Sequence, residues 1–141
     1  MLVYGMGEKA ITQIAQELLA GKKITDIQTI PQTAFISHTS KFNKKDNDVI
    51  IAGYQECIKD KKTFAATFKT IEEESNKYNS KRIIEPVDDG FLVVNPPFEP
   101  LTTNELDTIY TLPFTRLPHP KYRNKGEIPA YELIKHSVNI H

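Results

Sequence analysis

The sequence contains one cysteine, no tryptophan, no excess of charge of either sign and no long apolar run. A single cysteine, Cys57, excludes an internal disulfide and a cysteine-based zinc or cluster site built by one copy of the chain, and it points to a reducing compartment. Eighteen Lys and Arg balance eighteen Asp and Glu, so the charge does not indicate a nucleic-acid partner.

The apolar runs are too short for a membrane protein. Val49–Ala52 and Phe91–Val94 fall far below the roughly 20 residues of a membrane helix, and the first residues lack a basic leader. Composition therefore predicts a soluble, cytoplasmic protein with neither a nucleic-acid nor a membrane partner.

The first forty residues predict a strand, a tight turn and a helix. Leu2–Tyr4 is strand-like, Gly5–Gly7 forms the turn, and apolar residues then recur at helical spacing over Glu8–Ala20. Gly21 is placed to end the helix in a left-handed conformation. Because the strand opens the chain so abruptly, we expect the sequence to begin inside a longer unit of alternating strands and helices.

The middle of the chain predicts mainly helices. Ile24–Ile30 and Thr33–Ser37 suit short strands or an extended connector, and Lys41–Asp48 suits a solvated loop. Asp46 or Asp48 can cap a helix that begins at Val49 and runs to Ile58, and a second helix is expected from Phe64 to about Tyr78.

Residues 82–94 predict a β-hairpin. Arg82–Val87 and Phe91–Val94 flank Asp88-Asp89-Gly90, and Asp-Gly is typical of tight hairpin turns because both residues tolerate positive φ. Pro86 lacks an N–H group, which predicts that the first of these strands lies at a sheet edge.

Proline dominates the segment after the hairpin. Seven prolines lie between Asn95 and Pro129, which leaves room for one short helix at Thr103–Tyr110, capped by Thr102 or Thr103. Ile134–Ile140 then resumes a strand-like pattern. The predicted class is a mixed α/β fold in three segments. Residues 1–40 form an incomplete Rossmann-like βα unit, residues 41–94 a helical middle and a hairpin, and residues 95–141 a proline-rich extended strap.

The sequence offers no catalytic or metal-binding constellation. Gly5–Gly7 could cradle an anion at a helix N-terminus, but two glycines without a Lys-Ser/Thr pair favour an ordinary turn with Glu8 complementing the helix dipole. The four histidines lack metal-ligand spacing, and Cys57 suits a small buried thiol on the apolar side of a helix. The proline-rich run is either an extended linker or a strap that presents Arg116, His119 and Tyr122 to a partner.

The order of motifs after Asn95 resembles a known family. The matching motifs are Asn95-Pro96-Pro97, Pro100-Leu101-Thr102, Leu106-Asp107, Leu112-Pro113-Phe114 with Arg116, Pro118-His119-Pro120 with Tyr122, and Ile128-Pro129-Ala130-Tyr131-Glu132. This series is similar to the segment that precedes the CxxxCxxC motif in YgiQ-like radical SAM proteins, uncharacterised protein family 0313. Tyr4–Glu8 with its helix looks like the last βα unit of the family's Rossmann-like, cobalamin-binding-like domain.

The resemblance implies a larger enzyme whose [4Fe–4S] cluster and S-adenosylmethionine lie outside this chain, because one cysteine cannot supply the cluster's thiolates. The expected function is a non-catalytic fragment beside the enzyme's radical SAM barrel and Rossmann-like domain. The alternative is a stand-alone α/β interaction module with a proline-rich surface. Exposed end strands, Leu2–Tyr4 and Ile134–Ile140, predict either self-association through one of them or a disordered tail from about Ser137 onward.

Overall fold

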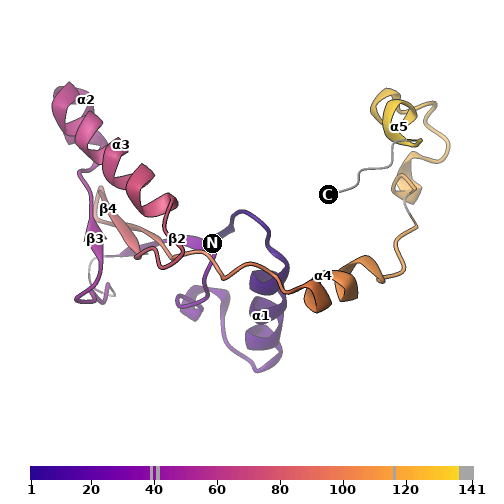
Figure 1. The fold of residues 1–141 in the computed structure, drawn as a ribbon, viewed down its shortest axis with the longest axis horizontal. Helices are drawn as coiled ribbons and strands as arrows, with labels where there is room; N and C mark the ends of the chain where they lie inside the picture. Colours follow the sequence, from indigo (N-terminus) through magenta and orange to yellow (C-terminus); the bar gives the residue numbers. More distant parts are fainter. Residues whose placement is uncertain (39, 41, 116, 137–141) are drawn as a thin grey trace. The chain divides into compact units, whose positions relative to one another are not determined.

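A computed structural model of the chain describes residues 1–38, 40, 42–115 and 117–136. The contacts group them into two compact units, residues 1–100 and 101–141, and Figure 1 shows the elements of each. The first unit contains β1 (Leu2–Val3), α1 (Glu8–Leu19), the 3-10 turn η1 (Ile24–Asp26), β2 (Thr33–His38), β3 (Val49–Ile50), α2 (Tyr54–Lys59), α3 (Lys61–Ser75), β4 (Ile83–Val87) and β5 (Gly90–Val94). The second contains α4 (Thr103–Tyr110), the 3-10 turn η3 (Pro120–Tyr122) and α5 (Pro129–Ile134).

The first unit is built on a five-stranded mixed sheet, which confirms the α/β class. The strand order is β1-β2-β5-β4-β3, and β3 and β4 form a parallel pair while the other neighbours are antiparallel. Since β1 pairs antiparallel with β2, the Rossmann-like character of this unit stays a prediction. The same holds for the way the three predicted segments belong to domains of a longer protein.

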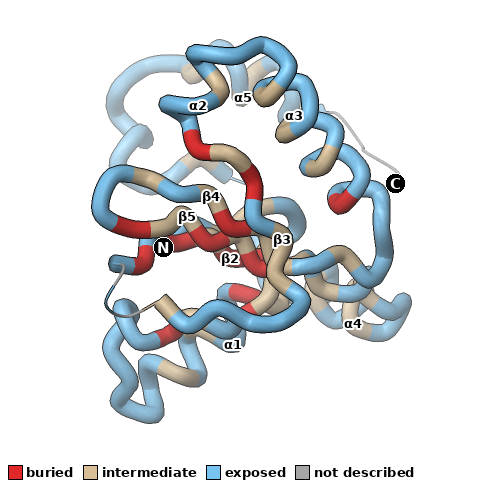
Figure 2. Tube along the Cα trace, turned by 90° about the vertical axis from the view of Figure 1, so that its left-hand side faces the viewer, coloured by how far each residue is buried: buried red, intermediate tan, exposed pale blue. Residues whose placement is uncertain are grey.

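Helices lie on both faces of the sheet (Figures 1 and 2). On one face, Val3 and α1 pack with η1 around Ala10, Ile27 and Ile30. The buried centre of the sheet is Phe35, Ile84 and Val93, against which Phe42 and Phe91 pack with ring centroids 4.3 Å apart. Figure 2 shows buried residues in the central strands β2, β4 and β5, and others in the helices and loops beside them. The pair α2–α3 lies on the opposite face.

The ends of the predicted helices follow their capping residues. Gly21 has φ of 85°, and the N–H groups of Gly21 and Lys22 donate to the carbonyls of Leu18 and Glu17, which is the Schellman arrangement. At α4, the Thr102 hydroxyl accepts from the Glu105 N–H and the Glu105 carboxylate accepts from the Thr102 N–H. The predicted helices over Glu8–Ala20 and Thr103–Tyr110 are therefore confirmed.

The predicted start and the predicted cap of the first middle helix are wrong. Val49–Ile50 is strand β3, and α2 begins only after Gly53, because Asp48 binds Arg82 and does not cap a helix. The Asp60 carboxylate instead caps α3 by accepting from the N–H groups of Lys62 and Thr63. Within Ile24–Ile30 the chain forms a 3-10 turn and no strand, whereas Thr33–His38 is the predicted strand.

The hairpin is confirmed, but its turn is shifted by one residue. Val87 pairs with Gly90, so Asp88 and Asp89 are the two turn residues, and Asp88 takes the positive φ of 40°. Gly90 is needed for a different reason: a Cβ there would lie 2.5 Å from the carbonyl oxygen of Ser37.

Strand β4 is not the edge that Pro86 predicted, because β3 lies outside it. The pairing with β3 covers Ile83 and Ile84 only. Pro86 lies beyond that pairing, where its missing N–H leaves no gap in a ladder.

The proline-rich segment is less extended than predicted, since η3 and α5 interrupt it. Ile134 is the last residue of helix α5 and does not start a strand. Pro129 lies in the first turn of this helix, where its missing N–H is tolerated. The rest of the predicted end strand, residues 137–141, lies outside the described residues.

Candidate functional site

A buried polar cluster surrounds Asn95, at the point where the sheet ends and the proline-rich segment begins. Asn95 is 4 % exposed. Its side-chain Nδ2 lies 3.0 Å from the carbonyl oxygen of Gln28, 2.9 Å from that of Ile30 and 3.0 Å from Oγ1 of Thr33. Thr33, fully buried, donates its hydroxyl to the Ile30 carbonyl at 2.6 Å. This amide therefore ties the end of β5 to the loop that enters β2.

Gln32 is the second centre of the cluster. It is buried with φ of 56°, and its Nε2 donates to the carbonyls of Tyr4 at 3.1 Å and Met6 at 2.9 Å. Its backbone N–H donates to the Pro96 carbonyl at 2.8 Å. The Pro96 carbonyl is thus joined to the β1–α1 turn through one residue, Gln32.

Tyr4 closes the cluster by donating its hydroxyl to the Asn95 carbonyl. Burial raises the pKa of the Tyr4 phenol, so the hydroxyl stays protonated and remains a donor at neutral pH. The cluster contains amides, hydroxyls and backbone groups. This composition suits fixing the path of the chain, since none of these groups is a nucleophile or a general base near neutral pH.

The glycine turn beside the cluster is filled by protein atoms. A Cβ at Gly5 would lie 3.0 Å from Nε2 of Gln32, and one at Gly7 would lie 2.9 Å from Cγ1 of Val3. The Gln32 amide bridges two carbonyls of this turn, those of Tyr4 and Met6. The two glycines therefore serve the close approach of Val3 and Gln32.

The sequence-predicted interaction residues lie in the second unit. Arg116 is outside the described residues. The His119 Nδ1 accepts from the backbone N–H of Lys121 at 3.2 Å and so caps η3. Tyr122, 40 % exposed, lines a pocket of about 430 Å³ together with Arg123 and Tyr131, and His119 is not among the lining residues. The structure thus places Tyr122 at a hollow and gives His119 a local capping role.

Among residues 1–136, leaving out 39, 41 and 116, no group of three His, Cys, Asp or Glu could hold a metal ion. The Cys57 sulfur lies 3.8 Å from both the Ala52 carbonyl and the Thr67 hydroxyl, and it is partly buried between α2 and α3. A [4Fe–4S] cluster that binds S-adenosylmethionine takes three thiolates. The residues of this chain do not fit that cofactor.

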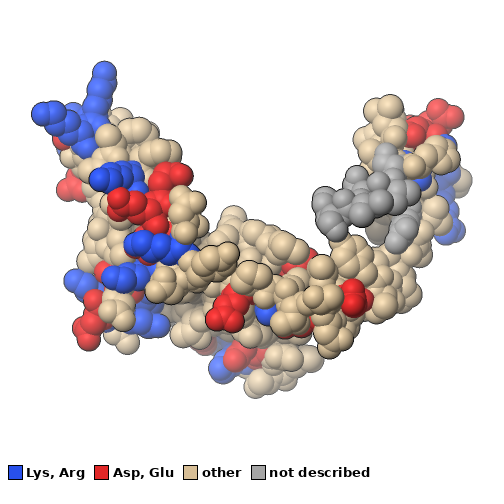
Figure 3. Space-filling view, in the orientation of Figure 1, with Lys and Arg blue, Asp and Glu red and all other residues tan. Residues whose placement is uncertain are grey.

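On the face shown in Figure 3, Lys and Arg alternate with Asp and Glu over α2 and α3. None of the described helices is both long enough and apolar enough to cross a bilayer. Mixed charge over these helices and a hollow at Tyr122 are thus two of the recognition features in the described part of the chain.

Comparison with known proteins identifies the family. The family model described as "Radical SAM N-terminal" matches residues 1–137. The chain belongs to the radical SAM N-terminal family. It is 45 % identical to a UPF0313 protein of Bacteroides thetaiotaomicron, 44 % to one of Porphyromonas gingivalis and 38 % to one of Methanocella arvoryzae. No solved structure matches the chain.

This radical SAM N-terminal chain is much shorter than its relatives. The three alignments cover all of it but only 24 %, 22 % and 23 % of the relatives' lengths. The match confirms the resemblance to uncharacterised protein family 0313. The Asn95-Pro96-Pro97 motif can be recognised from the sequence. The role of its hydrogen-bonding partners Tyr4, Gln32 and Thr33 cannot, since they look like ordinary polar residues beside two apolar strands.

Proposed function

We propose that residues 1–141 are a non-catalytic domain of a larger radical SAM iron–sulfur enzyme located in the cytoplasm. In this proposal the [4Fe–4S] cluster and S-adenosylmethionine are held by other parts of the polypeptide. The observation that carries it is that a chain matching the radical SAM N-terminal family over residues 1–137 has Cys57 as its sole cysteine. No group among the described residues identifies the substrate of the enzyme.

In this proposal the domain holds the start of the proline-rich segment, which connects it to the rest of the enzyme. The Asn95 side chain donates to the Ile30 carbonyl, and the Gln32 N–H donates to the Pro96 carbonyl. Together these two hydrogen bonds fix Pro96. The Phe98 N–H also lies 3.4 Å from Oε1 of Gln32, and the Phe98 ring packs against the core around Ala10. These contacts support a fixed exit path for the chain between Val94 and Phe98, from which the proline-rich segment continues.

The partners in this proposal are the radical SAM barrel and a Rossmann-like domain of the same enzyme. Residues of the proline-rich segment, with Arg116, His119 and Tyr122 as candidates, contact the barrel. The pocket beside Tyr122, lined also by Arg123 and Tyr131, supports Tyr122 best, because an aromatic side chain at a hollow contributes much contact area at small entropic cost.

The test is anaerobic reconstitution with iron and sulfide of both the 141-residue chain and the longer protein. We expect the chain alone to remain colourless, and the longer protein to show a broad absorbance at about 400 nm from thiolate-ligated iron. Absorbance in the chain alone that disappears in Cys57→Ser would contradict the proposal. Sequencing the gene beyond His141 distinguishes this proposal from the alternative. A stop codon favours the stand-alone interaction module, and a CxxxCxxC motif favours the enzyme.

A further inference from the structure

One side of strand β2 has no backbone partner along the last four of its six residues, among the residues that the structure describes. β1 pairs only with the first two residues of β2, through Leu2 with Ala34 and Val3 with Thr33. On its other side β2 pairs with β5 from Ala34 to His38. The β1 side of Phe35–His38 is therefore an open sheet edge.

The hydrogen-bonding direction of each residue on this edge is set by the register. The Asn95 N–H donates to the Thr33 carbonyl, so Thr33, Phe35 and Ser37 direct their backbone groups toward β5. Ile36 and His38 consequently direct theirs toward the open side. The contact between the Ser37 hydroxyl and the His38 carbonyl oxygen is weak, since their separation of 3.5 Å exceeds the usual O–H···O range of about 2.5–3.0 Å.

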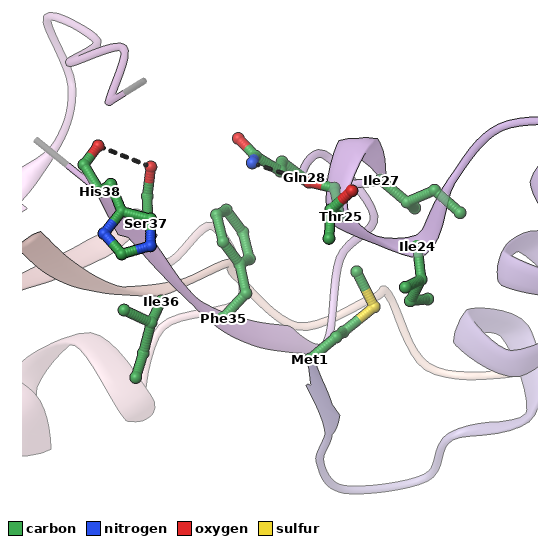
Figure 4. Close-up of a pocket in the computed structure, with 9 residues that line it drawn as sticks. All are labelled: Met1, Ile24, Thr25, Ile27, Gln28, Phe35, Ile36, Ser37 and His38. Carbon is green, nitrogen blue, oxygen red and sulfur yellow. Dashed lines mark hydrogen bonds between the residues drawn. The ribbon is translucent and has the colours of Figure 1, made fainter. Parts of the chain in front are cut away.

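A pocket lies along the same edge. It has a volume of about 480 Å³ and is lined by Met1, by Phe35–His38 of β2 and by residues of the η1 turn. Figure 4 shows Met1, Ile24 and Thr25 on one side of this space and Phe35 with Ser37 and His38 on the other. The pocket thus lies beside the unpaired backbone groups of β2 and next to Met1, the residue that precedes β1.

We propose that this edge is completed by the polypeptide preceding Met1 in the longer protein, which continues β1 as an antiparallel strand along Ile36 and His38. The proposal rests on the proposed function, because it needs the chain to be part of a longer polypeptide. Two observations select this occupant. β1 runs antiparallel to β2, so any residue before Met1 is directed along Phe35–His38. The relatives are about four times as long as this chain, and the proposal places part of that additional length before Met1.

The register assigns a place to each added residue. The first residue upstream of Met1 lies opposite Ile36, the second opposite Ser37 and the third opposite His38. The first and third exchange backbone hydrogen bonds with Ile36 and His38. Directly opposite residues share a face, so the side chain of the second lies on the same face as Phe35 and Ser37 and enters the pocket. A small side chain suits that place, since apolar residues such as Met1 and Ile24 and polar residues such as Gln28 both line it.

The first experiment is residue-resolved hydrogen exchange on the longer protein. We expect the Ile36 and His38 amides to exchange at least about tenfold more slowly there than in the 141-residue chain. The amides of Phe35 and Ser37 are the internal control, because β5 protects them in both proteins. Exchange of Ile36 and His38 at solvent rates in the longer protein would overturn the proposal. Hydrogen exchange does not depend on iron absorbance. The proposed function is tested by the absorbance and the strand pairing by the exchange, so the failure of one can be told from the failure of the other.

The second experiment identifies the occupant in the longer protein. Ser37→Cys is combined with a cysteine at the second residue upstream of Met1, and the oxidised protein is digested and analysed by mass spectrometry. We expect a disulfide-linked pair of peptides within one chain, because this is a non-hydrogen-bonded pair with short Cα separation. The matched control places the cysteine at the first upstream residue, on the opposite face, and should not cross-link. A cross-link between two chains, equal cross-linking of the control, or none in either variant would contradict the assignment.

Discussion

Arg82 and Asp48 form a bidentate ion pair. Arg82 Nε lies 2.8 Å from Oδ1 of Asp48, and its Nη2 lies 2.6 Å from Oδ2. The two side chains are 11 % and 2 % exposed, and Nη2 also donates to the Asn43 carbonyl at 2.8 Å. The pair joins the loop before β3 to the start of β4, the two strands that pair in parallel.

Replacing Asp48 by Ala is expected to destabilise the chain by about 3 kcal/mol, because Arg82 would stay buried without its counter-ion. The free energy of unfolding, measured by urea titration, gives the value. Asp46→Ala is the matched control, since Asp46 is an exposed residue of the same loop and should change stability little. An equal loss in both variants would mean that the ion pair is not the cause.

Stability should fall in acid, in part through Asp48. Burial opposes ionisation of this carboxyl, but hydrogen bonds from Arg82 and the Lys45 N–H, with the charges of both residues, outweigh it and hold its pKa below the usual value. A lowered folded pKa stabilises the protein above the unfolded pKa of about 4, and this contribution disappears as the pH falls through the folded value.

Glu74 acts in the same pH range. Hydrogen bonds from Lys77 and from the Lys81 N–H lower the pKa of this buried carboxyl. Unfolding free energies measured by urea between pH 7 and pH 3 should therefore be nearly constant at first and fall below about pH 4. The Asp48→Asn variant should show a shallower acid dependence; an unchanged slope would contradict the assignment to Asp48.

Asn95→Asp keeps the volume of the side chain but replaces its donor group by an acceptor. The new carboxylate would face the carbonyls of Gln28 and Ile30 inside the protein, so we expect a loss of about 2–4 kcal/mol in unfolding free energy. Asn79→Asp, at an exposed position of the same unit, is the control. If both variants are equally stable, Asn95 does not hold the start of the proline-rich segment in the way proposed.

Space, and not backbone conformation, limits substitution at Gly90. Its φ is not positive, but a Cβ would lie 2.5 Å from the Ser37 carbonyl oxygen, so Gly90→Ala and Gly90→Asn should both cost about 1–3 kcal/mol.

Gly21 is the contrasting position, with φ of 85° and no atom within 4 Å of an added Cβ. There Asn should be tolerated better than Ala, because Asn adopts left-handed conformations more readily. Thermal unfolding of the four variants separates the two causes. A lower cost of Asn than Ala at Gly90 would indicate a conformational origin there too.

Local patterns predict the elements whose signals lie within a few residues. The α1 helix, its stop at Gly21, the cap of α4 at Thr102 and the β4–β5 hairpin all depend on neighbours in sequence. The apolar spacing at Val49–Ile50 fits a helix as well as a strand, and the parallel partner that makes it a strand lies more than thirty residues away.

The polar cluster could not be predicted for the same physical reason. Asn95 and Gln32 are 63 positions apart, and each looks like an ordinary loop residue until the sheet brings them together. The sequence motif Asn95-Pro96-Pro97 marks the place, but the identity of the buried acceptors is a property of the folded sheet.

The position of β5 between β4 and β2 has a consequence for how the chain folds. The β4–β5 pairing closes a loop of two residues, whereas pairing Ala34 with Val94 joins positions 60 apart. Closing the longer loop costs more chain entropy, so the hairpin is expected to form first and to serve as the template on which β2, and then β1, add. Substitutions in the hairpin should then slow folding, whereas those in β1 should mainly speed unfolding.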